Sequence, residues 1–499
     1  MTLLDLFDAA CADDPRALAV NDVTYAGLAI GSLRVAAQLR EHGVSRGDRI
    51  AIYCENRLAF IFAYLALLRL GAIAVPANIL YRRSDLSHVL DDAGVTIAVA
   101  SEETAPHIRD LERSPTIIDA DLIDTWADDE SLEPLDINEL PLDDDPAVLV
   151  YTSGTTGRSK GAILTHANLA VIASQLVTSW RWTARDTLAI ALPLFHVHGL
   201  CAGLNGTLTA GARLILHKRF DAVAMLETLR QKNVSMFFGV PTMYVRLLET
   251  LGDGAPPALR LCVSGSAALA ADVHERFEAT FGMAILERYG ATEFGFALGN
   301  RYAGPRVPGS VGIPMPGVRI RIAQPGSGSA PLEAGAVGEL LVQGPNVTPG
   351  YWRNPEATAN AFVTDDEGTR WYRSGDLATY DAEQQVYRIV GRLKELIISG
   401  GFNIYPLEIE IEIDRFPGVR ASAVVGIPDE ARGEITAAFI EAEAGFDTDA
   451  LLAALREQLA SFKIPKRVTV IEALPRNALG KVEKHKLVRD AASAAATRR

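Results

Sequence analysis

The residues best suited to chemistry lie in a stretch rich in glycine and hydroxyl side chains, residues 151–161. It reads Tyr-Thr-Ser-Gly-Thr-Thr-Gly-Arg-Ser-Lys-Gly. Glycine lets the backbone turn several N–H groups toward one anion, and hydroxyl groups add donors with little bulk. Lys160 can neutralise charge on a phosphate oxygen. The stretch therefore predicts a phosphate-binding loop, although a Ser/Gly-rich turn without a ligand has a similar composition.

Two predicted elements would hold this loop. Residues 147–150, Ala-Val-Leu-Val, form an apolar run typical of a buried strand. Thr165 begins Thr-His-Ala-Asn-Leu, a typical helix start in which the threonine accepts from the first free amides. We therefore expect the loop to lie between a strand and a helix. It is not a P-loop of the Walker type, because Gly154 and Gly157 are three apart and no Gly-Lys-Ser/Thr follows.

Residues 151–161 resemble the signature loop of adenylate-forming enzymes, which include acyl-CoA synthetases, luciferases and peptide-synthetase adenylation domains. Within that family, the whole chain is most similar to malonyl-CoA synthetases. The resemblance implies an α/β fold with a large multi-sheet N-terminal domain, residues 1–391. A small mobile α+β lid, residues 392–499, would follow and rotate about a hinge at Lys394. Helical patterns at 33–42 and 58–70 alternate with strand-like runs at 49–53 and 72–75. This alternation independently favours α/β layering with a parallel sheet.

A second stretch, residues 285–295, reads Ile-Leu-Glu-Arg-Tyr-Gly-Ala-Thr-Glu-Phe-Gly. The resemblance implies that Tyr289 stacks on adenine, Thr292 contacts the α-phosphate and Glu293 holds Mg²⁺. Adenylation needs such groups, because a carboxylate that attacks ATP adds charge to an already anionic centre. The alternative is a turn with an exposed glutamate.

Arg288 in this stretch bears on the substrate. A buried guanidinium would be costly in a pocket for a fatty or aromatic acid, but it can bind the second carboxylate of a dicarboxylic acid with two hydrogen bonds. The alternative is that Arg288 pairs with Glu287 or another acid. The resemblance also assigns His196 and His198 to the acid pocket, and either could instead be a structural histidine or part of an adventitious metal pair. Two departures from malonyl-CoA synthetases count against an unmodified malonate pocket. Ala291 stands where those enzymes usually have methionine, and Phe294-Gly-Phe296 stands where they usually have smaller or polar residues. An altered or enlarged pocket, such as one for a substituted malonate, is the alternative.

The remaining expectations rest on the resemblance. Asp376 would bind the ribose hydroxyls and Lys481 would bridge the carboxylate and the α-phosphate, although without the family Lys481 is one lysine among several. The implied ATP contacts are Thr152, Ser153, Gly154, Thr155, Thr156, Gly157, Lys160, Gly265, Ser266, Glu287, Tyr289, Gly290, Asp376 and Arg392. The implied catalytic residues are Lys481, His196, Thr292 and Glu293, with metal contacts from Glu293 and Thr156. Substrate contacts would come from Arg288, His196, His198 and Ser266, and the coenzyme A tunnel from Gly400 and Gly401.

Composition limits the other classes. The chain has 499 residues, 48% hydrophobic and 22% charged, as expected of a soluble globular protein with two or more domains. Its net charge of −14 comes mostly from residues 119–145, which carry twelve Asp/Glu and no Lys or Arg. We interpret that segment as a solvated connection, and we expect no nucleic-acid partner. Four scattered cysteines, an acidic N-terminus and apolar runs too short for a bilayer predict a cytoplasmic protein without a membrane anchor.

These observations lead to one principal hypothesis with two alternatives. The chain is expected to ligate malonate, or a substituted malonate such as methylmalonate, to coenzyme A through an acyl-adenylate. ATP and coenzyme A would be consumed, Mg²⁺ would be bound, and AMP and pyrophosphate would be released. The alternatives are a ligase for a monocarboxylic fatty or aryl acid, and a nucleotide-binding protein without catalysis. The oligomeric state is not predicted.

Overall fold

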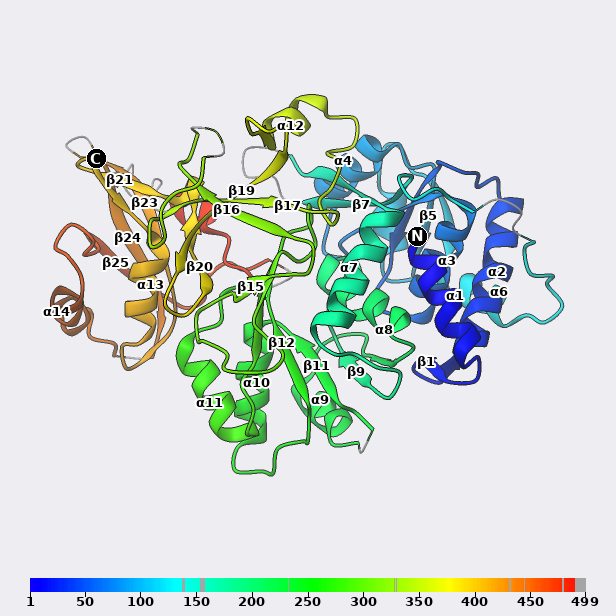
Figure 1. The fold of residues 1–499 in the computed structure, drawn as a ribbon, viewed down its shortest axis with the longest axis horizontal. Helices are drawn as coiled ribbons and strands as arrows, with labels where there is room; N and C mark the ends of the chain where they lie inside the picture. The colour runs from blue at the N-terminus through cyan, green and yellow to red at the C-terminus, as the bar shows by residue number, and fades with distance from the viewer. Residues whose placement is uncertain are drawn as a thin grey trace.

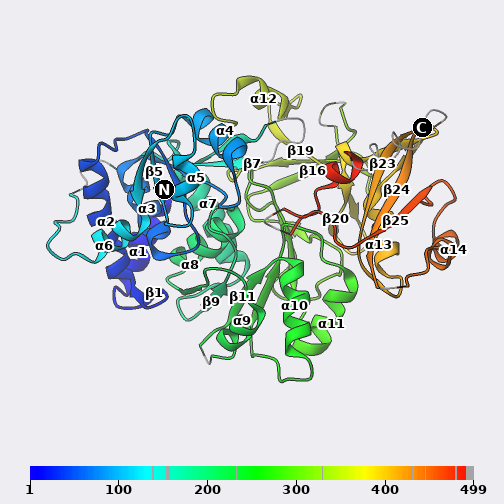
Figure 2. The same ribbon diagram turned by 180° about the vertical axis from the view of Figure 1, so that it is seen from behind.

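The structure is a computed structural model that describes residues 1–136, 140–152, 158–231, 233–326, 328, 330–429, 432–443, 445–477 and 480–489. These residues form two mainly parallel sheets, a third antiparallel sheet and a C-terminal sheet. Figure 1 shows the N-terminal sheet and the C-terminal sheet at opposite ends of the molecule, and Figure 2 shows the same arrangement from behind. The large multi-sheet N-terminal part and the small C-terminal part match the expected fold class.

The largest sheet has the strand order β15-β14-β13-β12-β11-β9-β10-β1-β2. Its centre is parallel, since β9 pairs with β10 and β11, and β12 pairs with β11 and β13, in parallel register. The strands are β1 (Leu18–Val20), β2 (Val23–Thr24), β9 (Thr187–Ile190), β10 (Arg213–Leu216), β11 (Met236–Gly239), β12 (Leu261–Ser264), β13 (Leu286–Tyr289), β14 (Leu298–Gly299) and β15 (Ile313–Pro314). Every residue of β9, β11 and β12 is buried, as expected for parallel strands covered on both faces.

The second sheet has the order β6-β5-β3-β4-β7-β8. Its strands are β3 (Arg49–Tyr53), β4 (Ile73–Pro76), β5 (Ile97–Ala100), β6 (Thr116–Asp119), β7 (Pro146–Thr152) and β8 (Lys160–Thr165). The phosphate-loop stretch joins β7 to β8, which are antiparallel neighbours. The expectation that it joins a strand directly to a helix is therefore wrong, because Lys160 begins a strand. The helix α7 (His166–Ser179) starts only after that strand, with Thr165 as its cap.

The helices follow apolar periodicity and capping. They are α1 (Leu3–Asp13), α2 (Tyr25–Glu41), α3 (Leu58–Leu70), α4 (Arg83–Ala93), α5 (Ala105–Arg109), α6 (Ala120–Asp128), α8 (Gly206–Thr209), α9 (Ala222–Leu229), α10 (Pro241–Leu251), α11 (Ala271–Phe281) and α12 (Pro355–Asn360), together with the π-helix η1 (His198–Asn205). The expected helix at 33–42 starts earlier, at Tyr25, because Thr24 caps it by accepting from the amide of Gly27 at 3.1 Å. The most apolar run is the core helix α3, and no helix in the described ranges is long and apolar enough to cross a membrane.

Two further sheets complete the chain; the third is antiparallel, and the fourth is antiparallel except for the parallel pair of β24 and β25. The third has the order β16-β17-β19-β18, with β20 on β19, and the fourth has the order β22-β21-β24-β23, with β25 on β24. Their strands are β16 (Arg319–Ala323), β17 (Gly338–Gln343), β18 (Phe362–Thr364), β19 (Arg370–Asp381), β20 (Val386–Arg392), β21 (Ile397–Ser399), β22 (Phe402–Ile404), β23 (Val419–Asp429), β24 (Gly433–Ala442) and β25 (Arg467–Ile471). The short helix η2 (Leu393–Glu395) links them, and α13 (Pro406–Asp414) and α14 (Thr448–Gln458) cover the fourth sheet. The lid predicted from the sequence, residues 392–499, contains this fourth sheet, and its boundary and motion stay predictions.

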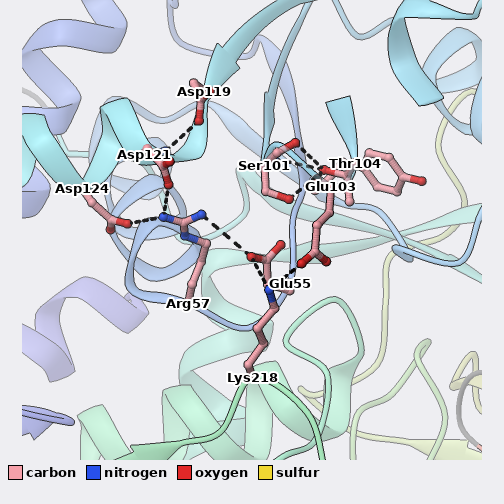
Figure 3. Close-up of polar contacts among 10 residues, drawn as sticks. Glu55, Arg57, Ser101, Glu103, Thr104, Asp119, Asp121, Asp124 and Lys218 are labelled. Carbon is pink, nitrogen blue, oxygen red and sulfur yellow. Dashed lines mark hydrogen bonds and ion pairs between the residues drawn. The ribbon is translucent and has the colours of Figure 1, made fainter. Parts of the chain in front are cut away.

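The acidic segment 119–145 is only partly a solvated connection. Residues 120–128 form α6, which packs on α2 and α3, because Ile123, Trp126 and Ala127 are buried. Arg57 neutralises part of its charge, with Nη2 2.7 Å from Asp124 Oδ2 (Figure 3). Beyond Arg57, Glu55 lies 3.3 Å from the Nζ of Lys218, which follows β10 (Figure 3). This network therefore links the largest sheet to the second sheet.

Candidate active site

Three strand ends of the largest sheet bring the predicted site residues together. Because β9, β11, β12 and β13 are parallel neighbours, their C-terminal ends lie along one edge. His196 follows β9, Gly265 and Ser266 follow β12, and Arg288 lies within β13 close to Glu293. Open α/β sheets bind ligands at this edge.

Arg288 is a buried side chain that lacks an acceptor. It is 6% exposed, and its Nε and Nη2 have no hydrogen-bond partner among the described residues. The guanidinium lies over the ring of Phe296, with 4.6 Å between Cζ and the ring centroid. Gly265 packs so closely against it that a Cβ there would lie 2.4 Å from Cζ. Burial lowers the pKa of Arg288 to about 9, so at neutral pH it is a cation that a bound anion could stabilise.

Glu287 lies on the other face of β13. Its Oε1 lies 3.4 Å from Nδ1 of His274 and accepts from the amide of Gly309 at 3.2 Å. Burial raises the pKa of Glu287. Arg288 therefore does not pair with Glu287, which was the alternative explanation for the arginine. The predicted ATP contact of Glu287 stays a prediction, and with the side chain facing His274 it would come from the backbone.

The two histidines predicted for the acid pocket, His196 and His198, differ in which ring nitrogen is free to form a hydrogen bond. His198 starts η1, a π-helix of the kind often found at functional sites, and it is 1% exposed. Its Nδ1 lies 3.4 Å from Oγ of Ser266, and its Nε2 has no partner among the described residues. Burial and Arg288 lower the pKa of His198 well below its usual value. His198 is therefore a neutral ring with an unpaired nitrogen close to Arg288.

His196 is held in one tautomer. The backbone N–H of His198 donates to its Nδ1 at 3.2 Å, so the proton of the neutral ring lies on Nε2. Burial, Arg288 and Lys481 lower the pKa of His196 to about 4. A ring with Nδ1 occupied and so low a pKa is a hydrogen-bond donor and a weak base. This arrangement argues against His196 as a base for the thiol.

The predicted ribose contact is held by two side chains from different sheets. Asp376 in β19 is 4% exposed. The hydroxyl of Tyr289 donates to its Oδ2 at 2.6 Å, and Nε of Arg392 lies 3.1 Å from its Oδ1. The pairing of β19 with β20 places Asp376 directly opposite Arg392. Tyr289, Asp376 and Arg392, which are all predicted to contact ATP, therefore form one cluster.

Glu293 and Lys160 meet through Tyr351. The hydroxyl of Tyr351 donates to Oε1 of Glu293 at 2.8 Å, and Nζ of Lys160 lies 5.4 Å from the centroid of the Tyr351 ring. Burial and the charge of Glu293 raise the pKa of Tyr351, so the phenol keeps its proton. Among the described residues no group of three or more His, Cys, Asp or Glu could hold a metal alone. One carboxylate with nearby hydroxyls fits Mg²⁺ that arrives on phosphates, since such sites use few protein ligands.

Lys481 reaches the site from the lid. Its amide donates to Oδ1 of Asn477 at 3.1 Å, which orders the turn. An added Cβ at the adjacent Gly480 would lie 3.4 Å from Oγ1 of Thr242 in α10, so this turn touches the N-terminal part. Burial and Arg392 lower the pKa of Lys481 to about 8. In Figure 1 the red C-terminal segment enters the middle of the molecule.

Other predicted residues lie in several places. Thr152 ends β7, Thr292 is buried, and Gly290 packs so tightly that a Cβ would lie 1.9 Å from the carbonyl of Gly295. Gly400 and Gly401, with φ of 58° and 85°, form the exposed turn between β21 and β22, whereas Lys394 lies exposed in η2. Ser153, Gly154, Thr155, Thr156 and Gly157 lie outside the described residues. The roles of all these residues stay predictions.

Sequence reasoning missed two aromatic residues of the site. Phe296 covers Arg288, and its sequence position was noticed only as a departure from malonyl-CoA synthetases. Tyr351 lies in residues 350–355, Gly-Tyr-Trp-Arg-Asn-Pro, a stretch whose sequence predicted no role. No spacing rule links Tyr351 to Glu293, because the contact joins residues 58 positions apart.

Comparisons with known proteins identify the family of the chain. The model of the AMP-binding enzyme family matches residues 7–352, and that of the AMP-binding enzyme C-terminal domain matches residues 408–481. Feruloyl-CoA synthase of Amycolatopsis sp is 38% identical, covering 94% of this chain and 95% of that protein. The mitochondrial malonate–CoA ligase of Mus musculus is 33% identical, covering 93% and 86%. Crystal structures of MatB from Rhodopseudomonas palustris, 38% identical and covering 98% and 99%, give TM-scores of 0.89 with ATP bound and 0.78 without it.

Proposed function

From the premise that the chain belongs to the AMP-binding enzyme family, we propose that this AMP-forming acid–CoA ligase activates malonate or a substituted malonate. Family membership supports adenylation and thioester formation. The particular acid rests on the pocket. A dicarboxylate has one carboxylate to activate and a second that needs a cation.

The observation that carries the proposal is the unpaired guanidinium of Arg288. A buried cation without a partner is costly, and it is tolerated where a ligand supplies the counter-charge. Nε and Nη2 are two donors in the fork that suits a carboxylate. His198 and Ser266 lie beside it and can add hydrogen bonds.

A ligase for an aromatic monoacid is the second candidate. The 38% identity to feruloyl-CoA synthase favours it, and so do the aromatic side chains around the pocket. Phe296 contacts His198 at 6.4 Å and Trp180 at 6.5 Å between ring centroids. In that case Arg288 would face an apolar acid and stay without a counter-ion. We therefore favour the dicarboxylate.

In the first half-reaction a carboxylate oxygen attacks the α-phosphorus of ATP, the bond to the β-phosphate oxygen breaks, and pyrophosphate leaves. Lys481 would position the carboxylate and the α-phosphate, while Tyr289, Asp376 and Arg392 would hold the nucleoside. Glu293 and, by resemblance, Thr156 would hold Mg²⁺, which neutralises phosphate charge when bound. The higher TM-score with ATP-bound MatB than with the ligand-free form supports this lid arrangement.

In the second half-reaction the thiol sulfur of coenzyme A would attack the acyl carbon, and AMP would leave. The lid has two faces suited to the two steps. Lys481 lies toward the site, whereas the Gly400–Gly401 turn belongs to β21 and β22 at the outer edge of the lid (Figure 1). Rotation about Lys394 would withdraw Lys481 and bring that turn to the site.

ATP–pyrophosphate exchange without coenzyme A tests the substrate. Malonate, methylmalonate, acetate, octanoate, 4-coumarate and ferulate would each be offered to the wild type and to Arg288→Ala, Arg288→Met and Arg288→Lys. We expect exchange with the malonates alone and a loss of at least about a hundredfold in kcat/KM in the alanine and methionine variants. Lysine keeps the charge but not the fork, so we expect partial retention.

Two controls keep this result interpretable. Met replaces the arginine with an apolar side chain of similar length, so its variant separates loss of charge from loss of packing. The ATP-induced rise in melting temperature should survive in every variant, because Arg288 lies on the acid side of the site. Exchange with ferulate or octanoate that ignores Arg288 would refute the malonate assignment and leave the ligase assignment intact.

A further inference from the structure

Tyr351 contacts two groups of opposite charge, Glu293, which is predicted to bind Mg²⁺, and Lys160, which is predicted to bind a phosphate of ATP. Its hydroxyl lies 2.8 Å from Oε1 of Glu293, and its ring lies under Nζ of Lys160. We propose that Tyr351 is a positioning residue that orients the Glu293 carboxylate toward Mg²⁺ and keeps it apart from Lys160. The proposal rests on the use of ATP and does not depend on which acid is activated.

The direction of the hydrogen bonds supports an orienting role. A phenol has one proton, and the Glu293 carboxylate can only accept, so the Tyr351 hydroxyl donates to Glu293. The hydroxyl of Tyr372 lies 3.0 Å from that of Tyr351, and it must then donate to the Tyr351 oxygen. Tyr372 is 5% exposed. A chain of two phenols, buried at Tyr372 and half-buried at Tyr351, therefore ends on one oxygen of the carboxylate and leaves the other oxygen for a cation.

The backbone around Tyr351 is tied to the strand that Lys160 begins. Tyr351 bridges to Ala162 in β8, and the amide of Trp352 donates to the carbonyl of Gly161 at 2.8 Å. The amide of Tyr351 donates to Oγ1 of Thr358 at 2.9 Å. Tyr351 is therefore fixed relative to β8 and to Lys160, at the strand's first position.

The backbone of Glu293 is also held from the same side. The amide of Thr348 donates to the Glu293 carbonyl at 2.7 Å, and the hydroxyl of Thr348 donates to the carbonyl of Ile163 in β8 at 2.6 Å. Both the main chain and the side chain of Glu293 are thus positioned by residues 348–351. Groups that orient a metal ligand typically change metal affinity by about 10- to 100-fold when they are removed.

The interposed ring has a second consequence. Without it, Lys160 and Glu293 could approach and neutralise each other before ATP arrives. The hydroxyl of Tyr351 donates a hydrogen bond to the Glu293 carboxylate, and the face of its ring attracts the Lys160 ammonium group. Both charges then stay available to the phosphates and to Mg²⁺. Tyr351→Phe removes the first contact and keeps the second, whereas Tyr351→Leu removes both.

The test compares Tyr351→Phe, Tyr351→Leu and Tyr372→Phe with the wild type. Tyr387→Phe is the matched control, because that tyrosine packs on Tyr380 in the third sheet, away from Glu293. The first readout is the melting temperature with ATP in EDTA and with ATP plus increasing Mg²⁺. The second is the Mg²⁺ concentration that gives half-maximal ATP–pyrophosphate exchange with an acid that the wild type accepts.

We expect Tyr351→Phe to keep the ATP shift in EDTA, lose most of the added Mg²⁺ shift, and need about tenfold more Mg²⁺ for half-maximal exchange. Tyr372→Phe should change the same quantity by about two- to threefold, and Tyr387→Phe should not change it. Tyr351→Leu should also weaken ATP binding in EDTA. An unchanged Mg²⁺ requirement in Tyr351→Phe would overturn the proposal, and so would a loss of exchange that is equal at every Mg²⁺ concentration. Absence of exchange in the wild type with every acid would instead count against the proposed function.

Discussion

The substitution Gly265→Ala gives the sharpest test of the pocket geometry. An alanine Cβ would lie 2.4 Å from both Cζ and Nε of Arg288 and 2.8 Å from Nη2. Carbon atoms in contact are normally about 3.5–4.0 Å apart, so the guanidinium would have to move by roughly 1 Å. It cannot move freely, because the ring of Phe296 lies 4.6 Å from Cζ.

The displacement of Arg288 should lower the activity with dicarboxylates, because they are the substrates that need its guanidinium. A displacement of about 1 Å at a positioning group costs about a hundredfold, which corresponds to about 2.7 kcal/mol in the transition state. We expect Gly265→Ala to lower kcat/KM for malonate in ATP–pyrophosphate exchange by about this factor. The affinity for ATP in EDTA, measured by titration calorimetry, should change by less than about threefold, because the ATP contact predicted for Gly265 is made by its backbone, which alanine retains.

Gly27→Ala is the matched control. Gly27 lies on the exposed side of α2, where an added Cβ would come no closer than 3.3 Å to Thr24 Oγ1. It should leave exchange unchanged and raise or preserve thermal stability. Wild-type activity with malonate in Gly265→Ala, in a protein with an unchanged melting temperature, would refute the idea that the guanidinium works from its present position.

Further predictions concern charge and stability. The kcat/KM of exchange should fall as pH rises through about 8, because Lys481 loses its proton there, and Lys481→Arg should move this fall to higher pH in a profile from about pH 6.5 to 9.5. Arg57→Ala should lower the free energy of unfolding in urea by about 1–2 kcal/mol, because it leaves Asp124 and Asp121 without their cation. Arg83→Ala, which breaks an exposed pair with Glu112 at 3.5 Å, should change it by less than about 0.5 kcal/mol. His196→Asn should retain adenylation if His196 is a donor, and single-turnover thioester formation should fall no more than adenylation does.

Much of the fold follows from local sequence. The core strand at Arg49–Tyr53 and the helix at Leu58–Leu70 were predicted at the bounds that the structure has, because continuous apolar runs of strand and helix length leave few alternatives. The start of α2 at Tyr25 was missed, since its cap at Thr24 precedes the apolar pattern. Polar segments were least predictable: residues 120–128 form α6 because a few apolar side chains find partners on α2 and α3.

For the site, too, some features were predictable from the sequence and others were not. The amino-acid sequence already contains the residue types that adenylation needs, namely a glycine-rich loop, Arg288, Glu293, Asp376 and Lys481, and their resemblance to a family indicated that reaction. The orientation of Glu287 toward His274 came from the three-dimensional structure, in which Arg288 has no acidic partner among the described residues. The three-dimensional structure also joined Tyr351 to Glu293 across 58 positions of chain. Such contacts depend on which strand ends and loops are neighbours in space. Long-range packing determines these neighbours, and the spacing of residues along the chain does not predict them.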